Sequence, residues 1–214
     1  MSHIAYDEML ELAAAGARVM HPRAVEIGEL YGVPIHVRSS FNSRVGTMIV
    51  AQVPMEDRQR VRGIAQESNV AKITVLGVRD RPGVAAAIFE PLGAAGISVD
   101  VIVQNVGHSG RTDLTFSVQE SDLKAAEKLV KAAAKTVGAR RVSSASGIAK
   151  LSIVGTGMLG MPGIAGRMFR ALSDAGINIE MISTSEIRIT CMVSRDQVDK
   201  GVRILHKTFE LDVE

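Results

Sequence analysis

Lys72-Ile-Thr-Val-Leu-Gly77 decides the fold, because the chain repeats this stretch as Lys150-Leu-Ser-Ile-Val-Gly155. Further along, Pro82-Gly83-Val84-Ala85 returns as Pro162-Gly163-Ile164-Ala165. The copies lie 78 residues apart at the first pair and 80 at the second, so the second copy carries two extra residues in one loop. Two copies are too few for a solenoid, which needs about three or more. The sequence therefore predicts two homologous small domains in tandem.

Each copy alternates apolar runs of strand length with longer amphipathic runs bounded by turn residues. In the first copy we expect strands at 72–78, 97–104, 112–118 and 140–145, helices at 83–95 and 121–137, and a turn around residues 107–110. In the second we expect strands at 150–154, 177–183 and 187–193, with helices at 163–175 and 196–207. The order βαββαβ predicts a ferredoxin-like fold and an α+β class.

The second copy has only a weak fourth strand. Residues 61–65 form a spare strand ahead of the first copy, followed by a predicted turn at 66–69. We infer that 61–65 completes the sheet of the second domain, so that the first domain is inserted into the second. The alternative, that residues 208–213 form the last strand, stays open.

Residues 1–53 differ in character from the repeats. Helices are expected at 6–19 and 22–30 and short strands at 34–39 and 46–50. These elements make a small core for an independent fold. We expect this segment to be the end of something larger, joined to the repeats by a linker at 54–60.

Composition excludes several classes of function. The chain has 25 basic and 23 acidic residues, interspersed, and only 3% aromatic residues, so a nucleic-acid partner is not expected. There is no signal-peptide pattern and no long uncharged apolar run, so no membrane partner is expected. The single Cys191 fits a reducing, cytoplasmic location. The five histidines lack metal-ligand spacing, and no catalytic residues, metal or cofactor are predicted.

Gly155-Thr-Gly157-Met-Leu-Gly160 matches the G-x-G-x-x-G pattern of dinucleotide-binding folds, with Glu180 at the spacing of a ribose-binding acid. The matching loop of the first copy has no such glycines, and Glu180 aligns with Asp100 of the repeat. Too few residues follow for a doubly wound sheet. We interpret this stretch as a ligand or contact loop.

Tandem βαββαβ units with Pro-Gly at the start of the first helix resemble ACT domains, the amino-acid-sensing modules of biosynthetic enzymes. Four stretches resemble more closely the regulatory half of bacterial aspartate kinase: Lys72-Ile-Thr-Val-Leu-Gly-Val-Arg-Asp-Arg-Pro-Gly83, Asp100-Val-Ile-Val-Gln-Asn105, Thr112-Asp-Leu-Thr-Phe116 and Glu180-Met-Ile-Ser-Thr-Ser-Glu-Ile-Arg-Ile189. Three earlier stretches resemble the last part of that family's amino-acid kinase domain: Asp7-Glu-Met-Leu-Glu-Leu-Ala13, Gly16-Ala-Arg-Val-Met-His-Pro-Arg23 and Val37-Arg-Ser-Ser-Phe41.

The resemblance implies a domain plan and a function. It implies a kinase-domain remnant at 1–53, a first ACT domain at 66–146 and a second at 61–65 plus 147–214. The family's phosphate-binding and aspartate-binding segments have no counterpart here, so we expect no aspartate kinase activity. The chain resembles a regulatory (beta) subunit that pairs with a catalytic (alpha) subunit, although a truncated chain would look the same. We also expect a homodimer through the ACT domains, because a four-stranded sheet leaves edges uncovered and the runs 97–103 and 177–182 are strongly apolar. The alternative is a stand-alone ACT-domain sensor serving another enzyme.

The resemblance implies threonine as the effector, with lysine as a second effector in some members. A zwitterion needs an anion site and a cation site a few ångströms apart. The amides of Gly83, Val84 and Ala85 offer the first, Asp80 the second, and Gln104 can bond a hydroxyl. An N-cap at Asp80 is the competing interpretation of this stretch.

The second domain is expected to close the threonine pocket. Asn178 and Ile179 lie on its matching strand. Asp100, Ser185 and Glu186 are candidates for a second effector site. Met161 and Ala165 stand where lysine-sensing relatives carry polar side chains, so we expect lysine to bind weakly or not at all.

Overall fold

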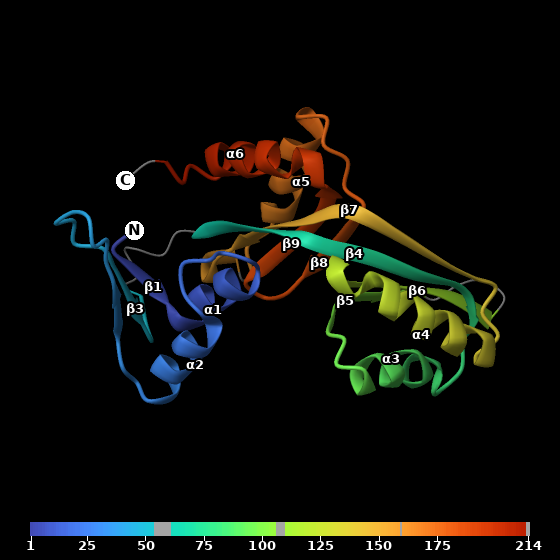
Figure 1. Cartoon of the computed structure of the whole chain (residues 1–214). Helices are drawn as coiled ribbons and strands as arrows, with labels where there is room; N and C mark the ends of the chain where they lie inside the picture. The colour runs from blue at the N-terminus through green and yellow to red at the C-terminus, as the bar shows by residue number, and fades with distance from the viewer. Residues whose placement is uncertain (54–60, 106–109, 159, 213–214) are drawn as a thin grey trace. The chain divides into compact units, whose positions relative to one another are not determined.

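The computed structural model describes residues 1–53, 61–105, 110–158 and 160–212. The chain divides into two compact units (Figure 1). One, called here the inserted unit, comprises residues 68–149, and the other, called the composite unit, comprises residues 1–67 and 150–214. Strands β4 (Gly63–Arg79) and β7 (Arg141–Val154) contribute residues to both units.

The inserted unit has four strands in the order β5-β6-β4-β7. Its remaining elements are α3 (Val84–Ala94), β5 (Val99–Gln104), β6 (Arg111–Gln119), a 3₁₀ turn (Glu120–Asp122) and α4 (Leu123–Thr136). Strand β6 pairs antiparallel with both β4 and β5. The buried residues of α3 and α4 recur three or four positions apart, which places them on one face of each helix against the sheet.

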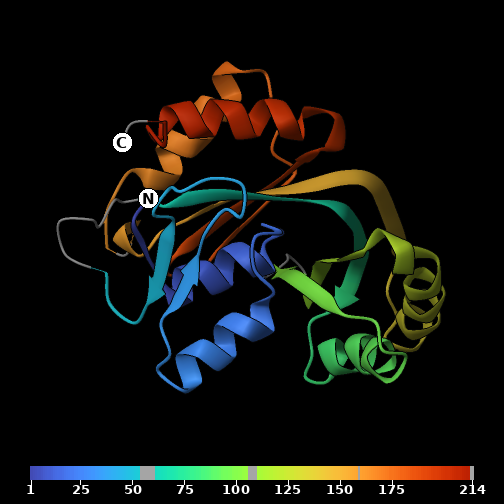
Figure 2. The ribbon, with the colours of Figure 1, turned by 60° about the vertical axis from the view of Figure 1, so that its left-hand side comes forward.

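In the composite unit the repeat continues with α5 (Ile164–Asp174), β8 (Met181–Thr184), β9 (Arg188–Ser194) and α6 (Val198–Thr208), preceded by 3₁₀ turns at Thr156–Met158 and Arg195–Gln197. The strand order is β4-β7-β9-β8. Helices α5 and α6 lie side by side over one face of these strands (Figure 2, orange and red). Gly201 lets α6 approach strand β7 closely, because a Cβ atom at this position would lie 2.7 Å from Leu151 Cδ2.

Residues 1–53 form β1 (His3–Ala5), α1 (Tyr6–Ala14), α2 (Pro22–Leu30), β2 (Ile35–Val37) and β3 (Thr47–Val50). The three strands have the order β1-β3-β2, with β1 parallel and β2 antiparallel to β3. Their core continues into the repeat, because Ala65 of β4 and Val154 of β7 belong to the same buried cluster as Ile4, Met9 and Leu12. Residues 1–53 therefore pack directly on the second repeat.

The first repeat is a βαββαβ unit, as predicted. The second runs βαββα, with β4 as the fourth strand beside β7. Several predicted boundaries were wrong. The predicted turn at 66–69 does not form, because residues 63–79 are one continuous strand. Residues 66–69 are Gln-Glu-Ser-Asn and include no Gly or Pro. The Asn69 Nδ2 atom donates a hydrogen bond of 2.7 Å to Gln119 Oε1 on the neighbouring strand β6. The predicted strands 140–145 and 150–154 are likewise one strand, β7.

Other corrections concern element ends. The alternative last strand at 208–213 is wrong for its described residues, because α6 runs to Thr208 and residues 209–212 form turns. The helix predicted at 6–19 ends at Ala14, since Gly16 adopts φ of 105°. Strand β8 begins at Met181 rather than at 177, and β1 was not predicted. The predicted linker 54–60, and most of the predicted turn at 107–110, lie outside the described residues.

Candidate functional site

The start of helix α3 is the centre of the predicted site. Gly83 is its N-cap, with φ of 88° and ψ of −10°, and Ala87 N–H donates to the Gly83 carbonyl at 3.0 Å. Within the described residues, the amides of Gly83, Val84 and Ala85 donate no hydrogen bond. A Cβ atom on Gly83 would have no neighbour within 4 Å, so positive φ, rather than crowding, requires the glycine. The arrangement offers amide donors to an anion in open space.

Asp80 and Gln104 lie at the same end of the inserted unit's sheet. Strand β4 ends at Arg79, which pairs with Arg111 at the beginning of β6, and Asp80 N–H donates to Gly110 O at 2.9 Å. Gln104 ends β5 and pairs with Leu114 of the same strand β6. Both side chains are exposed. The structure thus brings Asp80, Gln104 and the start of α3 to one end of the sheet.

Two residues that the sequence analysis missed brace this end of β4. A β-bulge falls between Val75 and Val78, and Gly77 within it has φ of 64°. Asp113 Oδ1 accepts the Gly77 N–H at 2.7 Å. The Arg111 guanidinium donates to the carbonyls of Gly77 and Gly138. Their charges and alternation on β6 gave no signal that distinguished them from ordinary surface residues.

The other predicted residues lie elsewhere. Asp100 is exposed near the opposite end of β5 from Gln104. Asn178, Ile179, Ser185 and Glu186 belong to the composite unit, where Ser185 and Glu186 occupy the exposed hairpin between β8 and β9. Ser185 N–H donates to Arg188 O across this hairpin at 2.8 Å. A pocket closed by Asn178 and Ile179, and a second effector site, remain predictions.

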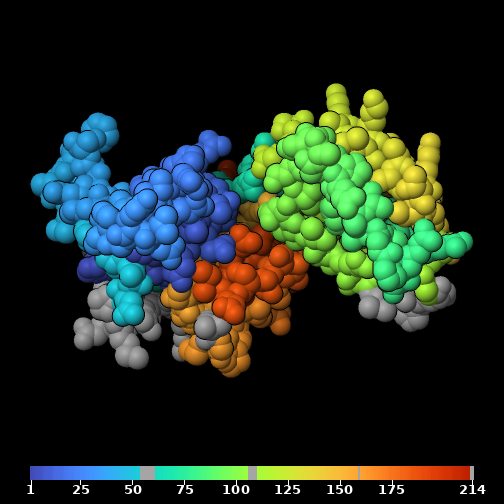
Figure 3. Space-filling model, turned by 90° about the horizontal axis from the view of Figure 1, so that it is seen from below, coloured from blue at the N-terminus to red at the C-terminus, as the bar shows by residue number. Residues whose placement is uncertain are grey.

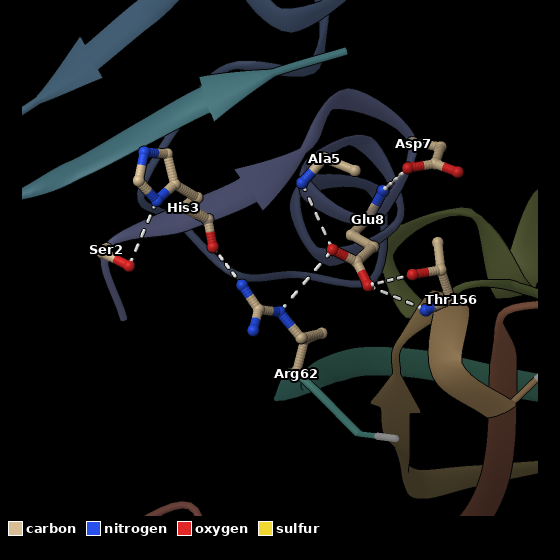
Figure 4. A network of polar contacts seen from close by, with 7 residues as sticks. All are labelled: Ser2, His3, Ala5, Asp7, Glu8, Arg62 and Thr156. Carbon is tan, nitrogen blue, oxygen red and sulfur yellow. Dashed lines mark hydrogen bonds and ion pairs between the residues drawn. The ribbon is translucent and has the colours of Figure 1, made fainter. Parts of the chain in front are cut away.

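A buried polar network holds α1 to the second repeat (Figure 4). Glu8 is 1% exposed, and its Oε1 accepts the amide and the hydroxyl of Thr156, both at 2.8 Å. Its Oε2 accepts Ala5 N–H at 3.2 Å and lies 3.7 Å from Arg62 Nε. Arg62, 6% exposed, also donates to the His3 carbonyl.

The glycine-rich stretch around Thr156 is therefore a contact loop, one of the two interpretations offered by the sequence. Gly155 N–H donates to Ile187 O at 2.9 Å, which ties the loop to the β8–β9 hairpin. The signal for Glu8 was present but went unused. An acid four residues before Leu12 lies on the apolar face of α1 and must find partners when buried.

Cys191 is fully buried on β9, and burial raises the pKa of its thiol to about 12. A thiol with such a pKa is a poor nucleophile. The described part of the chain contains no group of three or more His, Cys, Asp or Glu side chains able to hold a metal ion. No helix in the same part is long and apolar enough to cross a membrane.

Each repeat matches a known protein family. Models of the ACT domain match residues 72–135 and residues 151–209. The aspartate kinase of Pseudomonas fluorescens is 44% identical over 213 residues, which cover 99% of this chain and 52% of that protein. The chain thus spans about half the length of the curated relatives it matches.

Two solved structures are similar over different extents. A chain in the crystal structure of aspartokinase alpha and beta subunits is 39% identical with a TM-score of 0.66, and the match covers 70% of this chain and 99% of that one. Aspartate kinase from Synechocystis is also 39% identical, with a TM-score of 0.73. This match covers 98% of the present chain and 38% of the Synechocystis chain.

Proposed function

Since the chain belongs to the aspartokinase family and carries two ACT domains, we propose that it binds free threonine and regulates an aspartokinase catalytic subunit. The catalytic subunit would convert ATP and L-aspartate to 4-phospho-L-aspartate, a step in lysine, threonine and methionine biosynthesis. Threonine, a product made downstream, would then act as a feedback inhibitor. The chain itself supplies no catalytic residues under this proposal, and the free thiol of Cys191 fits a cytoplasmic location.

The observation that carries the proposal is the open start of α3. Three amides without protein partners among the described residues would receive the ligand's carboxylate, and the exposed Asp80 carboxylate would pair with its ammonium. Gln104 lies at the same end of the sheet and would bond the threonine hydroxyl. Asn178 and Ile179 would close the pocket from the second ACT domain.

Lysine would bind more weakly. Met161 is exposed near the start of α5 and Ala165 lies in its first turn, and neither offers a partner to a second ammonium group. Ser185, Glu186 and Asp100 would be the polar residues of any second effector site.

The exposed side chains of residues 1–53 support the proposal that the chain binds a catalytic subunit. This segment, blue in Figure 3, holds most of the large exposed apolar side chains found in the described residues. They are Met1, Val19, Ile27, Leu30, Tyr31, Val33, Phe41 and Val45, with Phe41 at 96% exposure. Exposed apolar side chains concentrated in one segment favour an interface there. We propose that residues 1–53 correspond to the last part of the kinase domain and contact the catalytic subunit.

The exposed edges of the two repeats support a homodimer. Ile102 on β5 and Ile182 on β8 hold equivalent repeat positions and are 52% and 42% exposed. Strands β5 and β8 each end the strand order of their unit. Unpaired edge strands with apolar side chains favour association between copies.

The test is an assay of ADP formation from ATP and aspartate, with the chain alone and mixed with an aspartokinase catalytic subunit. We expect no turnover by the chain alone and a threonine-dependent fall in rate for the mixture. Steady ADP formation by the pure chain would overturn the proposal. Tight threonine binding without any effect on the mixture would instead favour a sensor serving another enzyme.

A further inference from the structure

We propose that Glu8 acts as a built-in carboxylate ligand of the second repeat, and that this contact couples ligand binding in the ACT domains to residues 1–53. The inference deepens the proposed function and rests on it. It assigns the two repeats different tasks, the first binding a free amino acid and the second binding the chain's own helix α1.

The same loop is used differently in the two repeats. In each, a central strand leads through a loop to a helix that an αL glycine opens, Gly83 for α3 and Gly163 for α5. In the first repeat the loop residue Asp80 is exposed and the amides at the start of α3 have no partner among the described residues. In the second, Glu8 Oε1 takes both the amide and the hydroxyl of Thr156 at 2.8 Å. A carboxylate of the protein thus occupies two donors of the loop that precedes α5. The equivalent residue of the first repeat, Val78, is paired with Thr112 in the β4–β6 ladder instead.

The contact between Glu8 and the Thr156 loop is buried and charged, so displacing the loop relative to α1 is costly. Glu8 is 1% exposed and lies 3.7 Å from the Arg62 guanidinium, itself 6% exposed and bonded to the His3 carbonyl. Hydrogen bonds to a charged group strengthen in a region of low dielectric constant, and leaving either partner unpaired there is costly. The loop therefore cannot shift by a hydrogen-bond length without carrying α1 along or breaking the network.

A second ion pair joins the same helix to the neighbouring hairpin. Glu11 lies one turn after Glu8 on α1, and its Oε2 is 2.9 Å from Arg188 Nη1 at the beginning of β9. Ile187, the residue before Arg188, accepts the Gly155 amide. Loop and hairpin are thus tied to each other and to two successive turns of α1. A ligand that displaces either one has a polar route into residues 1–53.

The experiment measures amide hydrogen exchange in the full chain with and without saturating threonine. In the wild type we expect threonine to change exchange both at the start of α3 and in α1, Tyr6–Ala14. Thr156→Val removes only the hydroxyl donor and keeps the side-chain shape, so it should fold. We expect it to keep the response at α3 and to weaken the response in α1, because the Thr156 amide still donates to Glu8, whereas Thr156→Ser, which retains a hydroxyl, should respond as the wild type does.

Glu8→Gln is the stronger variant, and Glu26→Gln is its matched control, because Glu26 forms an exposed ion pair with Arg23 on α2. With a catalytic subunit present, Glu8→Gln should raise the half-inhibitory threonine concentration by about 5- to 150-fold, the usual range of a coupling between sites. An α1 response as strong as that of the wild type in both Thr156→Val and Glu8→Gln would overturn the inference while leaving the proposed function intact. A wild type that shows no threonine response anywhere would overturn the proposed function, and the inference with it.

Discussion

Gly83 and Gly163 hold nearly the same backbone conformation, φ 88° and ψ −10° against φ 93° and ψ −13°. Each is the N-cap of the first helix of its repeat, and neither would bring a Cβ atom within 4 Å of another residue. The duplicated sequence Pro-Gly therefore builds the same anion-receiving helix start twice. What differs is its surroundings, since Glu8 contacts only the loop of the second repeat.

Substitution of these two glycines separates folding from binding. We expect Gly83→Ala and Gly163→Ala to destabilise the chain by similar amounts, about 1–2 kcal/mol each, because both force alanine into the left-handed region. Only Gly83→Ala should weaken threonine binding as well. Denaturant unfolding and calorimetric titration measure the two effects. Equal threonine affinity in both variants would place the ligand away from α3.

A pair of helical glycines tests the packing of the composite unit. Gly201→Ala would place a Cβ atom 2.7 Å from Leu151 Cδ2, and Leu151 is fully buried. Gly166→Ala in α5 meets nothing within 4 Å and should stabilise by up to about 1 kcal/mol through helix propensity. We expect Gly201→Ala to be less stable than Gly166→Ala by about 1–3 kcal/mol because of overpacking. Equal unfolding free energies would show that α6 has room to move.

The raised pKa of Cys191 predicts a loss of stability in alkali. Between the ordinary thiol pKa and about 12, the unfolded chain releases this proton while the folded chain retains it. Stability should therefore fall as pH rises above about 8.5, by up to about 1.4 kcal/mol per pH unit from this group. Unfolding free energies of wild type and Cys191→Ala from pH 8 to 10 provide the comparison. The Ala variant should have the flatter slope, and parallel slopes would contradict the prediction.

Removal of Arg62 should be far more damaging than removal of a surface cation. Arg62→Met leaves the buried Glu8 carboxylate without its counter-charge, which costs about 3–5 kcal/mol in comparable buried pairs. Lys131→Met, which breaks the exposed pair with Glu127, should be nearly neutral. The double variant Glu8→Gln/Arg62→Met should lose less stability than the two single changes added together. Additive losses, measured by denaturant unfolding, would show that the pair does not act as a unit.

The repeat made most of the fold predictable, because internal duplication fixes element order independently of local propensity. Errors arose where tertiary pairing overrides local signals. Residues 66–69 look like a turn, yet the ladder of β4 runs through them. The open start of α3 was predictable because helix-start chemistry is local in sequence, and its role as an effector site stays a prediction. The position of Glu8 on the apolar face of α1 could have indicated its burial, but its partner Thr156 could not be predicted, because a contact between residues 148 positions apart leaves no local pattern.

The central claim is that threonine binds at the start of α3 with its hydroxyl held by Gln104. Calorimetric titration of the full chain with threonine and lysine, on the wild type and on Gln104→Ala, tests it most directly. A hydrogen bond to an exposed side chain contributes about 0.5–1.5 kcal/mol, so threonine affinity should fall by about 2- to 13-fold in the variant. Lysine should bind the wild type more weakly than threonine does. Unchanged threonine affinity in Gln104→Ala, or lysine binding as tightly as threonine, would contradict the account.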